Sequence, residues 1–121
     1  MQADIVIGRA ERMLATGLFE DAARSAYLAC FHVAQALIFE RTGRTAKSHH
    51  GVQVEFFRLS REAPDTDPQL RKFLSEAYEF KSVADYAIGA DAILPAEEAA
   101  GAVATARRFM AHFGKIGRAH V

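Results

Sequence analysis

The sequence predicts an all-α fold, an antiparallel bundle of four to five helices. The 121 residues include 3 prolines and no tryptophan, while the helix-favouring residues Ala, Leu, Glu and Arg are abundant. No stretch shows the sustained apolar–polar alternation of strands joined by hairpin turns. The length is that of one domain, enough to bury about two thirds of the surface of the unfolded chain.

Two helices are expected before the first polar connector, and each ends at a glycine. The first covers about residues 3–15 and stops before Gly17, a natural left-handed residue at the end of a helix. The second covers about residues 20–41, is the longest in the chain, and stops before Gly43. Both glycines therefore mark helix ends.

Two further helices follow, each with a capping residue. Ser48 can accept a free backbone amide of the next turn, so a third helix is expected over about residues 49–62. Asp67 can cap a fourth helix, which begins with a proline at its first position and extends over about residues 68–88.

A fifth helix is expected from Pro95 to near Gly114. Acidic residues follow the proline, as is typical of a first helical turn, and apolar residues recur on one face at three-four spacing. The last six residues, 116–121, back-translate to a common sequencing adapter. We therefore expect residues 1–115 to form a single domain and residues 116–121 to be a non-native tail.

Composition excludes several classes of function. Lys and Arg number 15 and Asp and Glu number 15, so this is not a domain that coats nucleic acid by charge alone. The single cysteine, Cys30, excludes an internal disulfide, a four-thiolate zinc site and an iron–sulfur cluster. Neither a signal peptide nor a run of about 20 apolar residues is present, so the protein is expected in the cytoplasm, with no membrane partner.

Most polar side chains of the second helix lie on one stripe, opposite small residues that allow another helix to approach closely. One interpretation is an ordinary solvated face. The other is a cleft or dimer groove, in which Arg24 and His32 would suit a ligand that contains phosphate. The members of this polar stripe are Asp21, Arg24, Ser25, Leu28, His32 and Gln35.

The fourth helix carries two opposite charges inside its apolar face. Lys81 and Asp85 are four residues apart, and burying either charge without a partner would be costly. One interpretation is an internal salt bridge that fixes the register of the helix. The other is a functional site where the fourth helix contacts Arg24 or His32 of the second.

A third cluster surrounds the start of the third helix. If Ser48 is the cap, His49 and His50 lie in the first turn, where the helix dipole disfavours a charged imidazole. A neutral histidine there could accept a proton, with Arg44 and Lys47 contacting phosphate. The alternative is a solvated helix start without chemistry. Zinc is not expected, because adjacent histidines face different directions.

Several stretches, taken in order, resemble the HEPN superfamily, the higher eukaryote and prokaryote nucleotide-binding domain, in a bacterial and archaeal branch. The resemblance spans about residues 3–113. The matching stretches are residues 22–32, 47–52 and 84–86, with weaker matches at 97–99 and 106–109.

The resemblance implies an all-α domain that usually dimerises and is often encoded beside a minimal nucleotidyltransferase in toxin–antitoxin pairs. In the nuclease branches, an Arg followed after four to six residues by His forms a metal-independent ribonuclease site at the dimer groove. Arg44 and His49 have that spacing. In such a site His49 would be the acid or base, and Arg44 would stabilise the developing phosphate charge.

The expected function is therefore that of a HEPN-like homodimer, one half of a two-component module with a minimal nucleotidyltransferase. It would bind nucleotide or RNA in a groove near His49, without a cofactor or metal, and cut RNA if Arg44 and His49 are catalytic. The alternative is a non-catalytic protein-interaction domain. The residues expected to line the groove are Arg24, His32, Lys81, Asp85 and Tyr86.

Overall fold

A computed structural model describes residues 2–61, 66–86 and 95–118, and the side chains of residues 3–61, 66–78 and 95–114. Five helices and no strand occur among the described residues, so the predicted all-α fold is confirmed. The helices are α1 (Gln2–Ala15), α2 (Phe19–Thr42), α3 (His49–Ser60), α4 (Pro68–Tyr86) and α5 (Ala96–Arg118).

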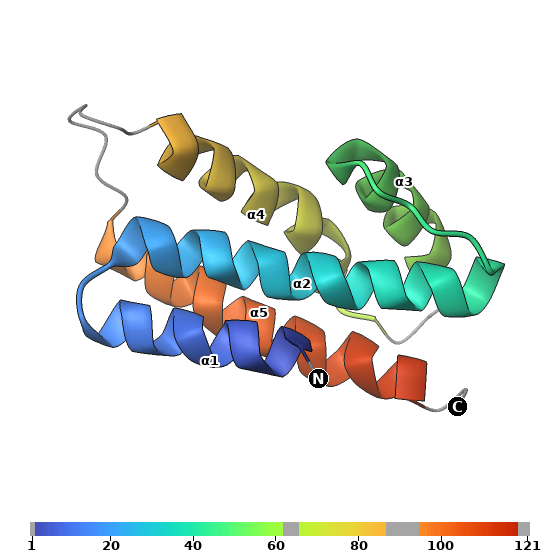
Figure 1. Cartoon of the computed structure of the whole chain (residues 1–121), viewed down its shortest axis with the longest axis horizontal. Coiled ribbons are helices and arrows are strands. Elements are labelled where there is room, and N and C mark those ends of the chain that lie inside the picture. Colours follow the sequence, from blue (N-terminus) through green and yellow to red (C-terminus); the bar gives the residue numbers. More distant parts are fainter. Residues whose placement is uncertain (1, 62–65, 87–94, 119–121) are drawn as a thin grey trace.

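The longest helix, α2, runs through the middle of the bundle (Figure 1). In this view α1 and α5 lie below it, and α3 and α4 lie above it. Both α1 and α4 run antiparallel to α2, and α3 lies over the second half of α2. Residues of α2, α3 and α4 therefore meet in one region on the upper side of the bundle.

The core forms where the small-residue side of α2 meets its neighbours. Each of the small and aliphatic residues that the sequence places opposite the polar stripe is buried: Ala22, Ala26, Ala29, Val33 and Leu37. At the other end of the core, Phe56 of α3 packs on α5, with ring centroids 5.2 Å from Phe109 and 4.8 Å from Phe113. These contacts attach α3 to the rest of the bundle.

The predicted helix boundaries are largely correct at the capping residues. Gly17 and Gly43 have φ angles of 83° and 71°, in the left-handed region that glycine adopts without strain. Ser48 caps α3, since its hydroxyl oxygen accepts the amide of Gly51 at 2.9 Å. The carboxylate of Asp67 accepts the amide of Gln69 at 2.9 Å at the start of α4.

Two helix ends differ from the prediction, and a third is not tested. The helix α3 ends at Ser60, whose hydroxyl donates to the carbonyl oxygen of Phe57 and so satisfies a free acceptor of the last turn. The helix α4 is described as far as Tyr86, and the rest of its expected span lies outside the described residues. The helix α5 passes through Gly114 to Arg118, because glycine inside a helix costs only about 1 kcal/mol and does not by itself stop it.

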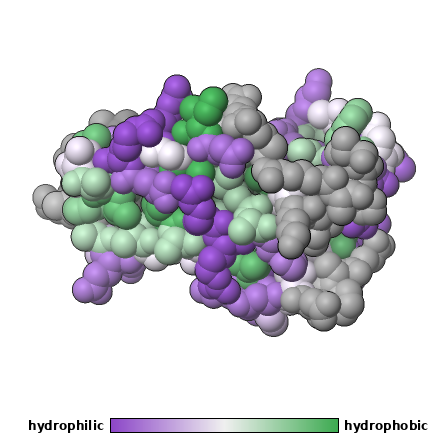
Figure 2. Space-filling view, turned by 90° about the horizontal axis from the view of Figure 1, so that it is seen from below, coloured by the Kyte–Doolittle hydropathy of each residue, from purple (hydrophilic) through white to green (hydrophobic). Residues whose placement is uncertain are grey.

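By length and composition alone, α2 could also cross a membrane. Most of its apolar stretch is buried inside the protein, and the core helices of soluble proteins meet the same criterion. Figure 2 views the bundle from below, the side of α1 in Figure 1, and shows a band of hydrophilic side chains beside apolar ones. The surface of α3 faces the opposite side.

Candidate functional site

His49 is the first residue of α3, and the Ser48 cap fixes its position. A side chain at residue 51 would place its Cβ 2.8 Å from the Ser48 hydroxyl oxygen, so Gly51 leaves room for the cap. The imidazole is half-buried. Its ring contacts place it at the junction of α2, α3 and α4.

Three aromatic rings surround the His49 imidazole. The ring centroids of Phe31, Tyr78 and Tyr27 lie 4.9, 5.1 and 5.6 Å from that of His49. Tyr27 and Phe31 come from α2 and Tyr78 from α4, so one histidine joins three helices. We call this group the aromatic cluster; its members are Tyr27, Phe31, His49 and Tyr78.

A hydrogen bond of 2.6 Å joins the hydroxyl oxygen of Tyr27 to Nδ1 of His49. Tyr27 is fully buried, and burial raises the pKa of its phenol well above the usual range, so the hydroxyl keeps its proton. A weaker effect in the opposite direction comes from a hydrogen bond with the side chain of Gln53, which lowers the pKa of Tyr27. A bond that favours the phenolate is one that donates to the phenol oxygen.

These contacts leave two arrangements of the protons at the site. The Tyr27 hydroxyl donates to Nδ1 of His49 when the neutral imidazole carries its proton on Nε2, and accepts from Nδ1 when that nitrogen is protonated. In the first arrangement Nε2 of His49 offers a hydrogen-bond donor to a ligand. In the second it offers a proton acceptor, the role considered from the sequence.

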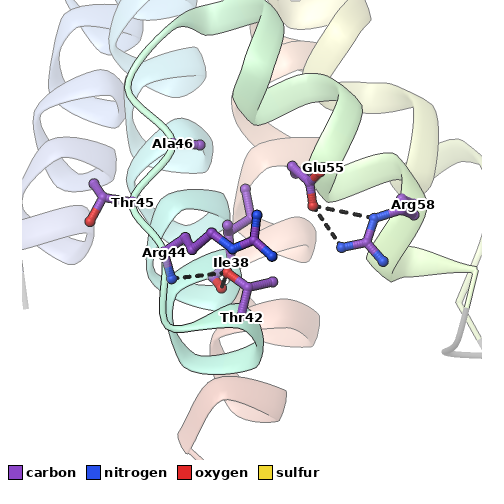
Figure 3. Close-up of a pocket in the computed structure, with 7 residues that line it drawn as sticks. All are labelled: Ile38, Thr42, Arg44, Thr45, Ala46, Glu55 and Arg58. Carbon is purple, nitrogen blue, oxygen red and sulfur yellow. Dashed lines mark hydrogen bonds and ion pairs between the residues drawn. The ribbon is translucent and has the colours of Figure 1, made fainter.

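Arg44 lies in a different environment, on the connector between α2 and α3. It lines a hollow of about 270 Å³ with the end of α2 and with Glu55 and Arg58 of α3 (Figure 3). Its backbone amide donates to the hydroxyl oxygen of Thr42 at 3.1 Å, and its side chain extends toward α3. The contacts described for His49 are those of the aromatic cluster, so the Arg44–His49 pair stays a prediction.

The polar stripe of α2 is half-buried rather than open to solvent along its length. Arg24 pairs with Asp21 at 2.9 Å, and the Gln35 amide donates to the carbonyl oxygen of Ala46 at 3.0 Å. The ring of His32 meets the edge of Phe31 with centroids 6.3 Å apart. The Gln35 bond ties α2 to the connector before α3, whereas the other two contacts lie within α2, and the role of these side chains in binding a ligand stays a prediction.

The remaining predicted groove residues lie in the last turns of α4. Lys81, Asp85 and Tyr86 belong to this helix, but their side chains lie outside the described part of the chain. The predicted pairing of Lys81 with Asp85 therefore also falls outside it.

The sequence did not single out Tyr27, Gln53 or Tyr78 as functional residues. One feature of the sequence could have identified Tyr27 as a site residue. It lies among small residues on the buried side of α2, where a hydroxyl needs a hydrogen-bond partner. The identity of the partner depends on the packing of α3 against α2, which the pattern of one helix does not contain.

Metal and thiol chemistry receive no support from the described residues. Among the side chains of residues 3–61, 66–78 and 95–114, no group of three His, Cys, Asp or Glu residues is placed to hold a metal ion. Cys30 is fully buried, and burial raises the pKa of its thiol well above the usual range, so it remains protonated.

Comparison with known proteins gives one finding for the whole chain. The family description HEPN domain matches residues 1–116, which is nearly the full length. No curated protein matches the chain. Since the match covers most of every described helix, the chain belongs to the HEPN domain family.

Proposed function

We propose that this HEPN domain binds nucleotide or RNA as one half of a two-component, toxin–antitoxin-like module whose other half is a minimal nucleotidyltransferase. The observation that carries the proposal is the hydrogen bond between the Tyr27 hydroxyl and Nδ1 of His49. It holds an imidazole at the start of a helix with Nε2 left for a ligand, and a proton on Nε2 would suit a phosphate oxygen.

The polar stripe of α2 adds a cation and a second imidazole near this point. Arg24 lies one turn before Tyr27 on α2, and His32 lies next to Phe31 of the aromatic cluster. With Lys81, Asp85 and Tyr86 of α4, these residues form the proposed groove. The proposed protein is a cytoplasmic homodimer that needs no cofactor.

A second candidate function is metal-independent cleavage of RNA. A catalytic imidazole works best when a third group fixes its orientation, and Tyr27 supplies that group here. The ribose 2′-oxygen would bond to phosphorus as the bond from phosphorus to the 5′-oxygen breaks. The 2′-hydroxyl gives up its proton and the leaving 5′-oxygen takes one. His49 would be the base for the first transfer as the neutral imidazole, or the acid for the second as the imidazolium, with water completing the other transfer. Arg44 would stabilise the negative charge that develops on the phosphate.

Binding and cleavage require separate measurements. Salt-dependent RNA binding that Arg24→Ala and His32→Ala abolish, without loss of helical circular dichroism, would support the groove. Arg9→Ala on α1 is the matched control, because Arg9 is exposed and its helix lies on the other side of the bundle. RNA cleavage in EDTA by wild type but not by His49→Ala would support catalysis, and equal cleavage would remove His49 from the reaction.

The non-catalytic alternative has its own outcome. If the purified protein neither binds nor cuts RNA, binds no nucleotide, and still co-purifies with a nucleotidyltransferase encoded beside it, the domain is a protein-interaction module. Light scattering of the purified protein then tests the homodimer independently of any ligand.

A further inference from the structure

Positive charge is concentrated in one segment of this neutral chain. The whole chain has 15 basic and 15 acidic residues, yet residues 41–61 contain five basic residues and a single acid, Glu55. This segment is the end of α2, the connector and α3. Its basic side chains are all exposed: Arg41, Arg44, Lys47, Arg58 and Arg61. Its charge complements an anionic ligand, although the net charge of the chain does not.

Two hollows are lined by α3, one shared with the end of α2 and the connector, the other with α4. The first is the hollow that Arg44 lines, and the second, of about 480 Å³, is lined by His50, Gln53, Phe57 and Arg61 among others. Arg58 lines both hollows. The two are therefore neighbours that meet at Arg58, and together we call them the α3 track.

An exposed aromatic ring lies inside the α3 track. Phe57 is 37% exposed, and the guanidinium carbons of Arg71 and Arg61 lie 4.7 and 5.4 Å from its ring centroid. Arg71 is held in place from α4, since its Nε donates to the Ser60 hydroxyl at 3.0 Å. Aromatic rings and planar guanidinium groups are the surfaces on which unpaired bases stack.

We propose that the α3 track binds single-stranded nucleic acid. Phosphates lie on Arg44, Arg58 and Arg61, and a base stacks on the Phe57 ring beside the Arg71 guanidinium. His50 and Gln53 offer hydrogen-bonding groups to the edge of that base. A basic path interrupted by an aromatic ring is the arrangement that binds single strands, whereas a duplex keeps its bases stacked inside.

The one acid of the track gives the proposal a distinctive consequence. Glu55 pairs with Arg58 at 2.7 Å, and both side chains are substantially exposed. Such a pair contributes little to stability, but its carboxylate repels a phosphate that approaches Arg58. Removing the charge of Glu55 should therefore strengthen binding.

The test measures fluorescence anisotropy of a fluorescein-labelled oligouridine titrated with the full chain. Phe57→Leu keeps apolar volume but removes the ring, and is expected to weaken binding at least about fivefold. Arg61→Gln should also weaken binding and reduce the slope of log affinity against log salt by about 0.7. Glu55→Gln should strengthen binding, and Arg9→Gln, the control with the same charge change as Arg61→Gln, should leave it unchanged.

Unfolding in urea verifies that each variant folds, and oligothymidine identifies whether the strand is RNA or DNA. The proposal is overturned if Phe57→Leu and Arg61→Gln bind oligouridine as wild type does, or if a duplex of equal length or polyglutamate binds as tightly. The proposal for the α3 track rests on the proposed function only in taking RNA, rather than DNA, as the single strand that is bound. If Arg24→Ala and His32→Ala lose oligouridine binding and the α3 variants keep it, the α3 track is contradicted and the proposed groove is supported. If the α3 variants lose binding and Arg24→Ala and His32→Ala keep it, only the α3 track is supported.

Discussion

The aromatic cluster and the α3 track are neighbours in sequence but are built by different forces. His49 and Phe57 both belong to α3, yet His49 faces a fully buried tyrosine while Phe57 is 37% exposed between two arginines. The cluster depends on one short hydrogen bond and on packing. The track depends on charges that water and salt screen. The helix α3 thus carries residues of both regions: His49 in the buried aromatic cluster and Phe57 on the exposed α3 track.

The difference also determines what a mutation measures in each region. The Tyr27 ring contacts three other rings: Phe31 of α2, His49 of α3 and Tyr78 of α4. Loss of Tyr27 therefore disturbs the fold and the site together. Arg44, Arg58 and Arg61 are exposed, so changing them affects binding more than stability. Matched substitutions in the two regions can therefore separate structural from functional roles.

The largest expected contrast comes from removing one ring in each region. Tyr27→Ala should lower the free energy of unfolding by about 3–5 kcal/mol, because a large buried side chain leaves a cavity. Phe57→Ala should lower it by less than about 1 kcal/mol, since the ring is partly in water and exposed cation–π contacts are weak. Urea unfolding followed by circular dichroism measures both. Equal losses in the two variants would contradict the division between cluster and track.

Removing only the hydroxyl of Tyr27 tests the hydrogen bond itself. Tyr27→Phe keeps the ring and should cost about 1 kcal/mol, the usual net contribution of one intramolecular hydrogen bond. In the neutral state of the wild type, nitrogen NMR of the His49 ring should show one dominant tautomer, set by the Tyr27 hydroxyl. In Tyr27→Phe both tautomers should appear, because Nδ1 no longer has this partner.

Tyr78→Phe is the control for that measurement. It removes a different hydroxyl from the same cluster and keeps a ring 5.1 Å from His49. The His49 tautomer should not change. A change as large as that in Tyr27→Phe would show that the Tyr27 hydrogen bond does not set the position of the proton.

The fold was predictable because its signals are local. The Ser48 cap and the glycines at 17 and 43 mark helix ends by their own backbone chemistry, and the small-residue side of α2 identifies a buried face. The Tyr27–His49 contact was not predictable, since the two residues are 22 positions apart and meet only when α3 packs on α2. The α3 track depends likewise on Arg71 of α4 reaching Phe57 of α3.

The connection between the two regions can be tested at the start of α3. Ser48→Ala should cost about 1 kcal/mol of unfolding free energy, because the Gly51 amide loses its acceptor. Gly51→Ala should change stability little, because the better helix propensity of alanine is offset by contact with the Ser48 hydroxyl, 2.8 Å from the added Cβ. In the Ser48→Ala background, Gly51→Ala should instead stabilise by about 0.5–1 kcal/mol. Additive effects in this double-mutant cycle would contradict the role assigned to Gly51.

The smallest expected effect concerns an exposed charge outside both regions. The Gln69 amide and the Arg108 side chain, whose guanidinium lies 2.8 Å from Asp67, hold the pKa of the Asp67 carboxyl below its usual range. A lowered pKa in the folded state adds stability above the unfolded value, about pH 3.9, and that contribution disappears as the pH falls through the folded pKa.

Asp67→Asn keeps an acceptor for the Gln69 amide and removes only the charge. The wild type should melt slightly above Asp67→Asn at pH 7, and the difference should shrink toward pH 2 and in 1 M salt. If the difference persists unchanged in acid, the charge of Asp67 does not cause it, and exposed ion pairs such as Glu55–Arg58 then carry still less of the stability of this bundle.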